Sequence, residues 1–280
     1  RGLGDVYKRQ VDFYNCVIMK IVFIGAGNLA THLSQALSKA GHDIVQVYSR
    51  TKDAAHVLAS KIGATSTNDI KDIVCNADIY IFSVKDDVLP SVVEPLCVGA
   101  RDALFLHTAG SVPMTVFKGK ALRYGVFYPM QSFTKSRELD LSNVPVYIEG
   151  DSEATLSTIR LLAESVSKKV RVMDSEKRRK LHLAAVFASN FVNCCYDLAS
   201  EIMREIDADF SDFLPLIDET ASKVHDITPR EAQTGPAVRY DQNVMMRQLE
   251  LLQDRPIAHK VYEVMSEAIH ELHVLKNSSC

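Results

Sequence analysis

The chain has 280 residues, of which 47% are hydrophobic and 24% are charged, and its formal net charge is −3. This composition is typical of a globular protein and excludes a disordered, collagen-like or low-complexity chain. A slightly acidic chain has no basic field that would attract nucleic acid or an anionic membrane, so neither partner is expected. The length is that of about two domains.

The cysteines and the apolar segments exclude two further classes of protein. None of the six cysteines forms a CxxC pair or a Cys/His cluster, so no metal site is expected. The longest apolar segment, residues 181–199, contains His182, Asn190 and Asp197 and is expected to be a buried helix rather than a membrane span. Without a secretory signal, the expected location is the reducing cytoplasm.

The first 18 residues show no clear periodicity and no apolar region followed by a cleavage site. Met19 then opens a segment, MKIVFIGAGN, that has the look of a natural protein start. We therefore treat residues 1–18 as a non-native extension and expect the fold to begin at Met19.

From Met19 onward, short apolar runs alternate with helical patterns. Strands are predicted at 21–24, 44–48, 76–83, 103–108, 125–128, 146–149 and 170–173, and helices at 28–40, 53–61 and 88–96. This alternation predicts an α/β domain with a mainly parallel sheet over residues 19–174. Beyond it, helices are predicted at 176–205, 209–226, 235–252 and 256–275, which indicates an all-α domain over residues 175–280.

A glycine-rich turn is the strongest chemical signal in the sequence. The pattern Gly25-x-Gly27-x-x-Ala30 follows an apolar strand and opens a helix, as in Rossmann dinucleotide-binding domains. Gly25 would allow the tight turn, and Gly27 would let a pyrophosphate approach the backbone. Asn28 and Leu29 would offer it the N–H groups of the helix start. The alternative is a plain strand–turn–helix with glycines for geometry, which the surrounding elements make less probable than a nucleotide site.

The ends of the next strands indicate which cofactor is bound. A carboxylate at the end of the second strand would bind the ribose of NAD, but Ser49, Arg50 and Thr51 stand there. A guanidinium with neighbouring hydroxyls suits a 2′-phosphate, so NADP is predicted. The alternative for Arg50 is a solvated loop residue. At the end of the 76–83 strand, Ser83, Val84 and Lys85 are expected to face the cofactor, although the sequence favours an ordinary loop charge over a catalytic role for Lys85.

Several motifs occur in a characteristic order: MKIVFIGAGNLATHLSQAL, VYSRT, IFSVKDD, HTAGS, GVFYPMQSF, HLAAVFASNFVN and TGPAVRYD. Over nearly the whole chain from Met19, they resemble Rossmann-like NADP oxidoreductases with a helical C-terminal domain of unknown function, DUF2520. The wider superfamily includes pyrroline-5-carboxylate reductase, 6-phosphogluconate dehydrogenase and the β-hydroxyacid dehydrogenases. The resemblance implies a Rossmann domain followed by a 6-phosphogluconate-dehydrogenase-like helical domain, a substrate cleft between them and a homodimer.

Hydride transfer needs a group that handles the proton, and candidates lie where strands end. His107 closes the 103–108 strand and could exchange a proton near neutral pH, or could be a structural histidine. Gln131 and Ser132 follow the next strand and could bind substrate. On the long helix, Asn190 is a second catalytic candidate. The β-hydroxyacid dehydrogenases place a catalytic Lys four residues before such an Asn, whereas Val186 stands there in this chain.

The last motif adds two substrate-binding candidates, Thr234 and Arg239. Thr234 could instead cap a helix, whereas Arg239 would hold an anionic group. The basic run 177–180 is expected to be a solvated helix face. Together these features predict an NADP(H)-dependent oxidoreductase that transfers hydride to or from a small carbonyl or imine substrate. The alternative is a non-catalytic NADP(H)-binding sensor or scaffold.

Overall fold

The computed structural model describes residues 18–97 and 102–277, so residues 1–17 of the expected extension lie outside the described residues. Contacts between residues divide the chain into two compact units, residues 1–189 and 190–280. This division falls later than the predicted boundary at residue 174, because the first helix after the last strand is anchored to the sheet. The predicted fold class, a Rossmann-like part followed by a helical part, is confirmed.

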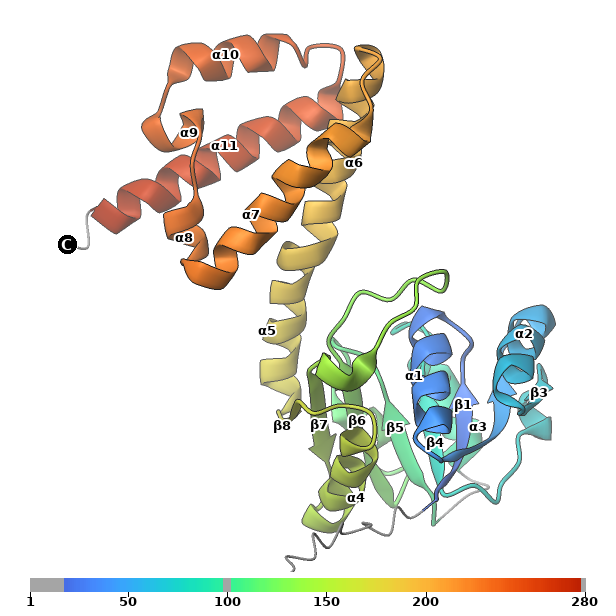
Figure 1. Ribbon diagram of the computed structural model, residues 1–280. Coiled ribbons are helices and arrows are strands. Elements are labelled where there is room, and N and C mark those ends of the chain that lie inside the picture. The colour runs from blue at the N-terminus through green and yellow to red at the C-terminus, as the bar shows by residue number, and fades with distance from the viewer. Residues whose placement is uncertain (1–17, 98–101, 278–280) are drawn as a thin grey trace, which may run out of the picture. The chain divides into compact units, whose positions relative to one another are not determined.

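An eight-stranded sheet with the order β3-β2-β1-β4-β5-β6-β7-β8 forms the centre of the first unit (Figure 1). All neighbouring strands are parallel except β6 and β7. The strands are β1 (Lys20–Ile24), β2 (Asp43–Tyr48), β3 (Thr65–Thr67), β4 (Ile79–Phe82), β5 (Leu104–His107), β6 (Arg123–Pro129), β7 (Val146–Gly150) and β8 (Val170–Val172). The helices of this unit are α1 (Asn28–Lys39), α2 (Lys52–Ile62), α3 (Leu89–Cys97), α4 (Glu153–Glu164) and α5 (Ser175–Ala185).

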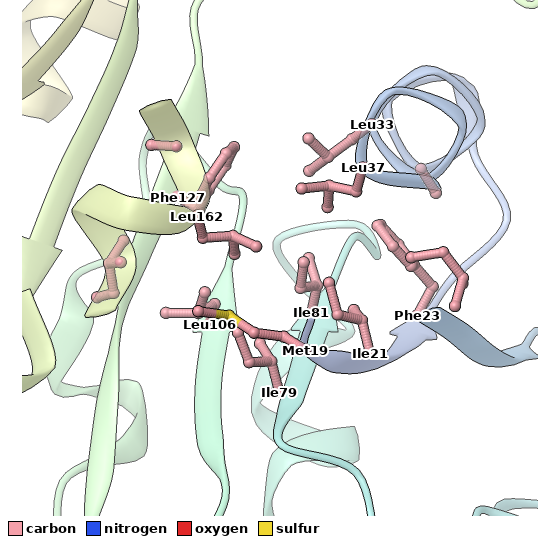
Figure 2. Packing of buried hydrophobic residues seen from close by; sticks show 14 of the residues in the cluster. Met19, Ile21, Phe23, Leu33, Leu37, Ile79, Ile81, Leu106, Phe127 and Leu162 are labelled. Atoms are coloured by element: carbon pink, nitrogen blue, oxygen red, sulfur yellow. The ribbon is translucent and has the colours of Figure 1, made fainter. Parts of the chain in front are cut away.

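Both faces of the sheet are buried, because the strands are apolar on both sides. Alternate residues of β1 belong to different clusters: Ile21 and Phe23 pack with α1 and α4, whereas Val22 and Ile24 pack with α3. Figure 2 shows the first cluster, in which Leu33 of α1 lies above the strand residues. Burying one such side chain stabilises the fold by roughly 1.5–3 kcal/mol. These two clusters fix the carboxyl ends of the strands, where ligands of open α/β sheets bind.

One strand and one α-helix of this unit were not expected from the sequence. The edge strand β3 is polar and carries no alternating apolar pattern. Helix α4 begins after Ser152, whose hydroxyl accepts a hydrogen bond from the Thr155 N–H, and it buries Ile159 and Leu162 against the sheet. The seven strand positions that were predicted all contain strands.

The second unit contains only helices in its described part, as predicted. They are α6 (Val192–Glu205), α7 (Leu214–Asp226), α8 (Pro229–Ala232), α9 (Pro236–Arg239), α10 (Gln242–Glu250) and α11 (Pro256–Asn277). Helix α5 continues into α6 through a π-helical segment, Val186–Phe191. The predicted helix 235–252 is interrupted because Tyr240 adopts a left-handed conformation, φ 53°, at the end of α9. Among the described helices, none has the length and apolar character needed to cross a bilayer.

Candidate functional site

The turn after β1 brings Gly25 against the end of β4. Gly25 has φ +116°, and a Cβ on it would lie 2.3 Å from the Ser83 carbonyl oxygen. Its N–H donates to the Tyr48 carbonyl of β2 at 2.8 Å. Three adjacent strands therefore converge on this residue, and only glycine combines the backbone conformation with the close approach.

Gly27 has a different environment and is exposed. Its φ of −77° is open to any residue, and the nearest atom to a Cβ there would be the Ser83 oxygen at 4.0 Å. The packing of the described residues thus leaves free the space that a side chain would fill. Gly27 precedes α1, whose first turn has no acidic residue and no side-chain cap. The unpaired N–H groups of that turn therefore remain available to an anion, so the residues present fit a pyrophosphate.

The other two residues predicted in this turn act differently. The Asn28 side chain donates to the Phe133 carbonyl at 2.9 Å and so holds the loop after β6 over α1. The ring of Phe133 also packs near His32 of α1, with centroids 5.6 Å apart. The Leu29 side chain is half-buried against the core. What both residues can offer a phosphate is therefore the backbone N–H.

At the end of β2, Ser49, Arg50 and Thr51 stand where an NAD-binding Rossmann domain carries a carboxylate for the adenosine ribose. The Ser49 hydroxyl accepts from the Thr51 N–H at 3.4 Å, and Thr51 precedes α2. Arg50 is exposed and has no hydrogen-bond or ion-pair partner among the described residues. A free guanidinium between two hydroxyls fits a 2′-phosphate better than a bare ribose diol.

The end of β4 lies next to the glycine turn. The Ser83 N–H donates to the Ile24 carbonyl at 2.8 Å, and its hydroxyl lies 3.0 Å from that of Thr108 after β5. Val84 is half-buried, while Lys85 is exposed and its carbonyl accepts two N–H groups of the turn that leads into α3. Ser83 and Val84 therefore form part of the surface at the carboxyl edge of the sheet, and Lys85 extends into solvent beside it.

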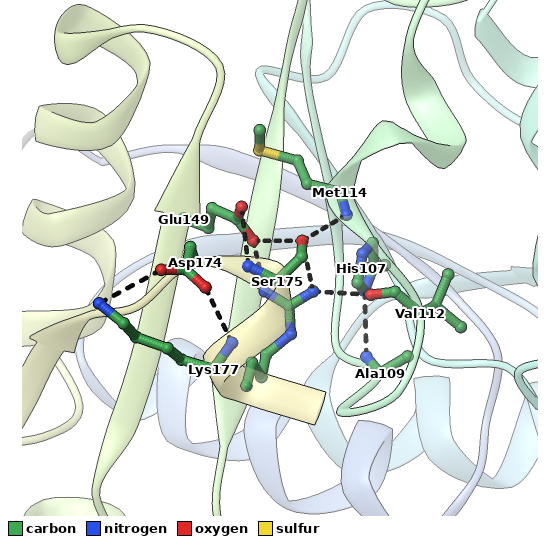
Figure 3. Close-up of polar contacts among 9 residues, drawn as sticks. His107, Ala109, Val112, Met114, Glu149, Asp174, Ser175 and Lys177 are labelled. Carbon is green, nitrogen blue, oxygen red and sulfur yellow. Dashed lines mark hydrogen bonds and ion pairs between the residues drawn. The ribbon is translucent and has the colours of Figure 1, made fainter. Parts of the chain in front are cut away.

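A buried charge network attaches α5 to the sheet (Figure 3). The Arg178 guanidinium, 0% exposed, is paired with Glu149 of β7 and donates to the Val112 carbonyl at 2.6 Å. Ser175 donates its hydroxyl to Glu149 at 2.7 Å and accepts the Met114 N–H at 2.9 Å. The prediction that residues 177–180 form a solvated face is therefore wrong for Arg178, because its tertiary partners satisfy the charge.

His107 lies beneath this network rather than in an open site. Its side chain is fully buried, stacks on Phe117, and accepts the Ala109 N–H at Nδ1 over 3.2 Å. Burial, with a smaller contribution from the nearby Arg178 charge, lowers the pKa of His107 to about 3. The imidazole is neutral at physiological pH, and this placement favours a structural role over proton transfer.

A second histidine, on α5, contacts the same edge of the sheet. The Tyr128 hydroxyl of β6 lies 2.9 Å from His182 Nδ1, and the two rings meet edge-on with centroids 5.9 Å apart. A Cβ on Gly110, in the turn after β5, would lie 2.5 Å from the His182 ring. The sequence alone did not link these residues, since their pairing depends on how α5 packs.

The predicted substrate-binding residues are exposed. Gln131 and Ser132 follow β6, and the Gln131 side chain accepts the Ser132 N–H at 2.8 Å. In the second unit, Asn190 lies in the π-helical segment, and Arg239 ends α9. Thr234 does not cap α9, because Gly235, with φ +109°, occupies that position. The structure groups Gln131 and Ser132 with the sheet edge, whereas the other three belong to the separate helical unit.

The chain is similar to known proteins in both of its units. Residues 20–106 match the family model "NADP oxidoreductase coenzyme F420-dependent", and residues 144–269 match the "Domain of unknown function (DUF2520)". A Bacteroides fragilis protein described as a "putative NADP oxidoreductase" is 47% identical, with 91% of this chain and 98% of that chain covered and a TM-score of 0.89. A search of curated proteins finds no significant match.

More distant structures share the fold. A 1-pyrroline-5-carboxylate reductase from Streptococcus pyogenes is 13% identical with a TM-score of 0.59, covering 91% of this chain and 99% of that one. An imine reductase from Myxococcus stipitatus, solved with NADP+, is 18% identical with a TM-score of 0.64, covering 90% and 93%. Fold and glycine turn define a Rossmann protein of the NADP oxidoreductase type. Within that class, the chain belongs to the family that joins this domain to DUF2520.

Proposed function

We propose that this protein is an NADP(H)-dependent oxidoreductase that transfers hydride to or from a small carbonyl or imine substrate. The observation that carries the proposal is the unfilled space at Gly27 before an uncapped helix, together with an exposed Arg50 that has no ion-pair partner among the described residues. The first feature suits a pyrophosphate and the second a 2′-phosphate. Bound NADPH would supply the hydride, and the chain would supply position and a proton.

The residues at the carboxyl edge of the sheet would bind different parts of the cofactor and the substrate. The helix start at Gly27 and Asn28 would hold the pyrophosphate through backbone N–H groups, and Arg50 would select the phosphorylated ribose. Ser83 and Val84 would contact the cofactor on the side of β4. Gln131, exposed after β6, would present its amide to the substrate.

Replacing Arg50 by alanine is expected to weaken NADPH binding about 10- to 100-fold, because a charge-assisted hydrogen bond contributes about 1.5–3 kcal/mol. NADH binding should not change. Calorimetric titration of both nucleotides checks this, with Arg171→Ala as the control, since Arg171 is exposed on the far edge strand β8. If neither nucleotide binds the wild-type chain, the oxidoreductase proposal fails.

We also infer that two copies of the chain associate through their helical units. Helix α11 carries a stripe of exposed apolar side chains: Ile257, Val264, Met265 and Leu272, at spacings that place them on one side of the helix. Ile257 is 72% exposed and Leu251, after α10, is 81% exposed. So much uncovered apolar surface supports a large, obligate interface with a second copy.

The Val264→Asp/Leu272→Asp variant is therefore expected to have half the mass of the wild-type protein in solution, because two carboxylates would be buried in the interface. Sedimentation equilibrium checks the mass. Val57→Asp/Leu122→Asp, which changes exposed residues of the same types in the first unit, should stay dimeric. A wild-type protein that is monomeric at every concentration would contradict the inference.

A further inference from the structure

Tyr128 and His182 form a polar pair at the carboxyl edge of the sheet, apart from the glycine turn and Arg50. Tyr128 is the last residue but one of β6 and is 7% exposed, and its hydroxyl is bonded to His182 Nδ1 at 2.9 Å. His182 lies one turn after Arg178, the buried residue that fixes α5 to β7 and to the Val112 carbonyl. Both members of the pair are thus held by buried structure, which is the condition for a precisely oriented catalytic group.

The turn after β5 is shaped around this pair. A Cβ on Gly110 would lie 2.5 Å from both Cγ and Nδ1 of His182. The imidazole therefore rests directly on the backbone of the turn, where a larger residue would displace it. In the same turn the Ser111 hydroxyl donates to Asp86, which follows β4. The loops after β4 and β5 and the end of β6 meet at one place.

This place lies in the half of the sheet that would receive the nicotinamide. In a Rossmann sheet, the strands on the far side of β1 from the adenosine corner form the second mononucleotide-binding half. Here those strands are β4, β5 and β6. Ser83 and Thr108, 3.0 Å apart through their hydroxyls, lie between the glycine turn and the Tyr128–His182 pair along the carboxyl edge.

We propose that Tyr128 is the acid that protonates the substrate oxygen during reduction of a ketone or aldehyde, with His182 as the positioning residue that restores its proton. This rests on the proposed oxidoreductase function. As hydride reaches the carbonyl carbon, the π pair of the C=O bond moves onto oxygen. The Tyr128 O–H bond breaks and its proton forms the alcohol. The phenolate then takes the proton that His182 carries on Nδ1, and solvent gives a proton to Nε2 of the same imidazole, so the ring changes tautomer and every proton is accounted for.

The electrostatic setting suits a carbonyl substrate. Burial raises the pKa of the Tyr128 phenol, opposed by the Arg178 charge and reinforced by Tyr147 and Asp86. The phenol therefore stays protonated and neutral at physiological pH. A neutral donor is matched to an uncharged carbonyl, whose oxygen gains negative charge during hydride transfer. An imine is commonly bound as a cation that loses its charge in the same step, and so gains less from this donor.

The first test locates the pair relative to the cofactor and needs no substrate. With ring-labelled tyrosine in the full chain, saturating NADP+ should give a nuclear Overhauser effect between the Tyr128 ring protons and the nicotinamide H4 proton. The Tyr128→Phe variant, prepared with ring-labelled phenylalanine, should show the same nuclear Overhauser effect from the ring protons of the introduced phenylalanine, because the substitution keeps the ring in place. Nuclear Overhauser effects from the nicotinamide H4 proton to other residues but not to Tyr128 would overturn the proposal, although the cofactor site itself would stand. If NADP+ does not bind, the proposed function itself fails.

The second test measures the proton step. Tyr128→Phe should lower kcat/KM for aldehydes and 2-oxo acids about 100-fold or more, the usual contribution of a general acid, with NADPH affinity unchanged. Tyr124→Phe, on the same strand and without a side-chain hydrogen bond among the described residues, is the matched control. His182→Ala should lower kcat with little change in KM, and added imidazole should restore part of the rate, which a purely structural residue would not allow.

Two outcomes would overturn the assignment of substrate and acid. One is reduction of 1-pyrroline, a cyclic imine, at a rate far above that of every aldehyde and 2-oxo acid and unaffected by Tyr128→Phe. The other is a His182→Ala variant whose kcat equals that of the wild-type protein in the absence of imidazole. Thermal melting of each variant separates these results from loss of folding.

Discussion

Replacing Arg178 by methionine is expected to lower the free energy of unfolding of the first unit by about 3–5 kcal/mol, the usual cost of breaking a buried ion pair. The guanidinium is 0% exposed and Glu149 is 15% exposed, so removing the cation leaves a carboxylate with little water around it. The Val112 carbonyl also loses its donor. Thermal melting followed by circular dichroism should show the first unit unfolding roughly 10 °C earlier.

The control for this prediction is Arg179→Met, because Arg179 is an exposed neighbour in the same helix. It should melt within about 1–2 °C of the wild-type protein, as surface substitutions usually do. The double variant Arg178→Met/Glu149→Leu should recover a large part of the loss, since it removes both charges together. Equal melting of Arg178→Met and Arg179→Met would show that the network contributes little to stability.

Substituting the two glycines of the β1 turn is expected to separate folding from cofactor binding. Gly27→Ala should leave the free energy of unfolding within about 0.5 kcal/mol of wild type, because its backbone is extended and its Cβ would meet only the Ser83 oxygen at 4.0 Å. The same methyl group would occupy the space proposed for the pyrophosphate. NADPH affinity should therefore fall roughly 100-fold, equivalent to about 2.7 kcal/mol.

Gly25→Ala is the informative counterpart. Its φ of +116° and the 2.3 Å approach of the Ser83 oxygen would cost roughly 3–5 kcal/mol of strain and overpacking. Chemical denaturation and calorimetry on both variants measure the two quantities independently. Gly27→Ala with unchanged NADPH affinity would contradict the placement of the pyrophosphate at α1.

Local patterns in the sequence were sufficient for most of the fold. The apolar run at 21–24, the turn Gly25–Gly27 and the helix after it were predicted where they occur, because each rests on neighbouring residues. The polar edge strand Thr65–Thr67 was missed, since β2 is the one described strand that pairs with it and no apolar pattern marks it. The helix 235–252 was predicted as continuous because nothing in the sequence indicated that Tyr240 would adopt a left-handed conformation.

The site residues also fall into two groups, those that a local motif predicts and those whose roles depend on residues distant in the sequence. The glycines and Arg50 could be proposed from a motif and its spacing, because the motif's function is local to one turn. Arg178, Tyr128 and His182 could not, since their roles depend on partners at sequence separations of 29 and 54 residues. His107 shows the same limit: its position at a strand end allowed both a catalytic and a structural role, and only tertiary packing reveals that its side chain is fully buried.

The continuous helical segment from α5 to α6 limits where this protein can be joined to a relative in a chimaera. The compact units divide between Ser189 and Asn190, inside the π-helical segment Val186–Phe191, and no loop separates them. Each backbone carbonyl there is bonded to a residue further along the helix, so the division falls within a hydrogen-bonded repeat. An engineered chimaera of this protein should therefore take residues 175–205 from a single parent, so that the side chains of α5, the π-helical segment and α6 remain matched.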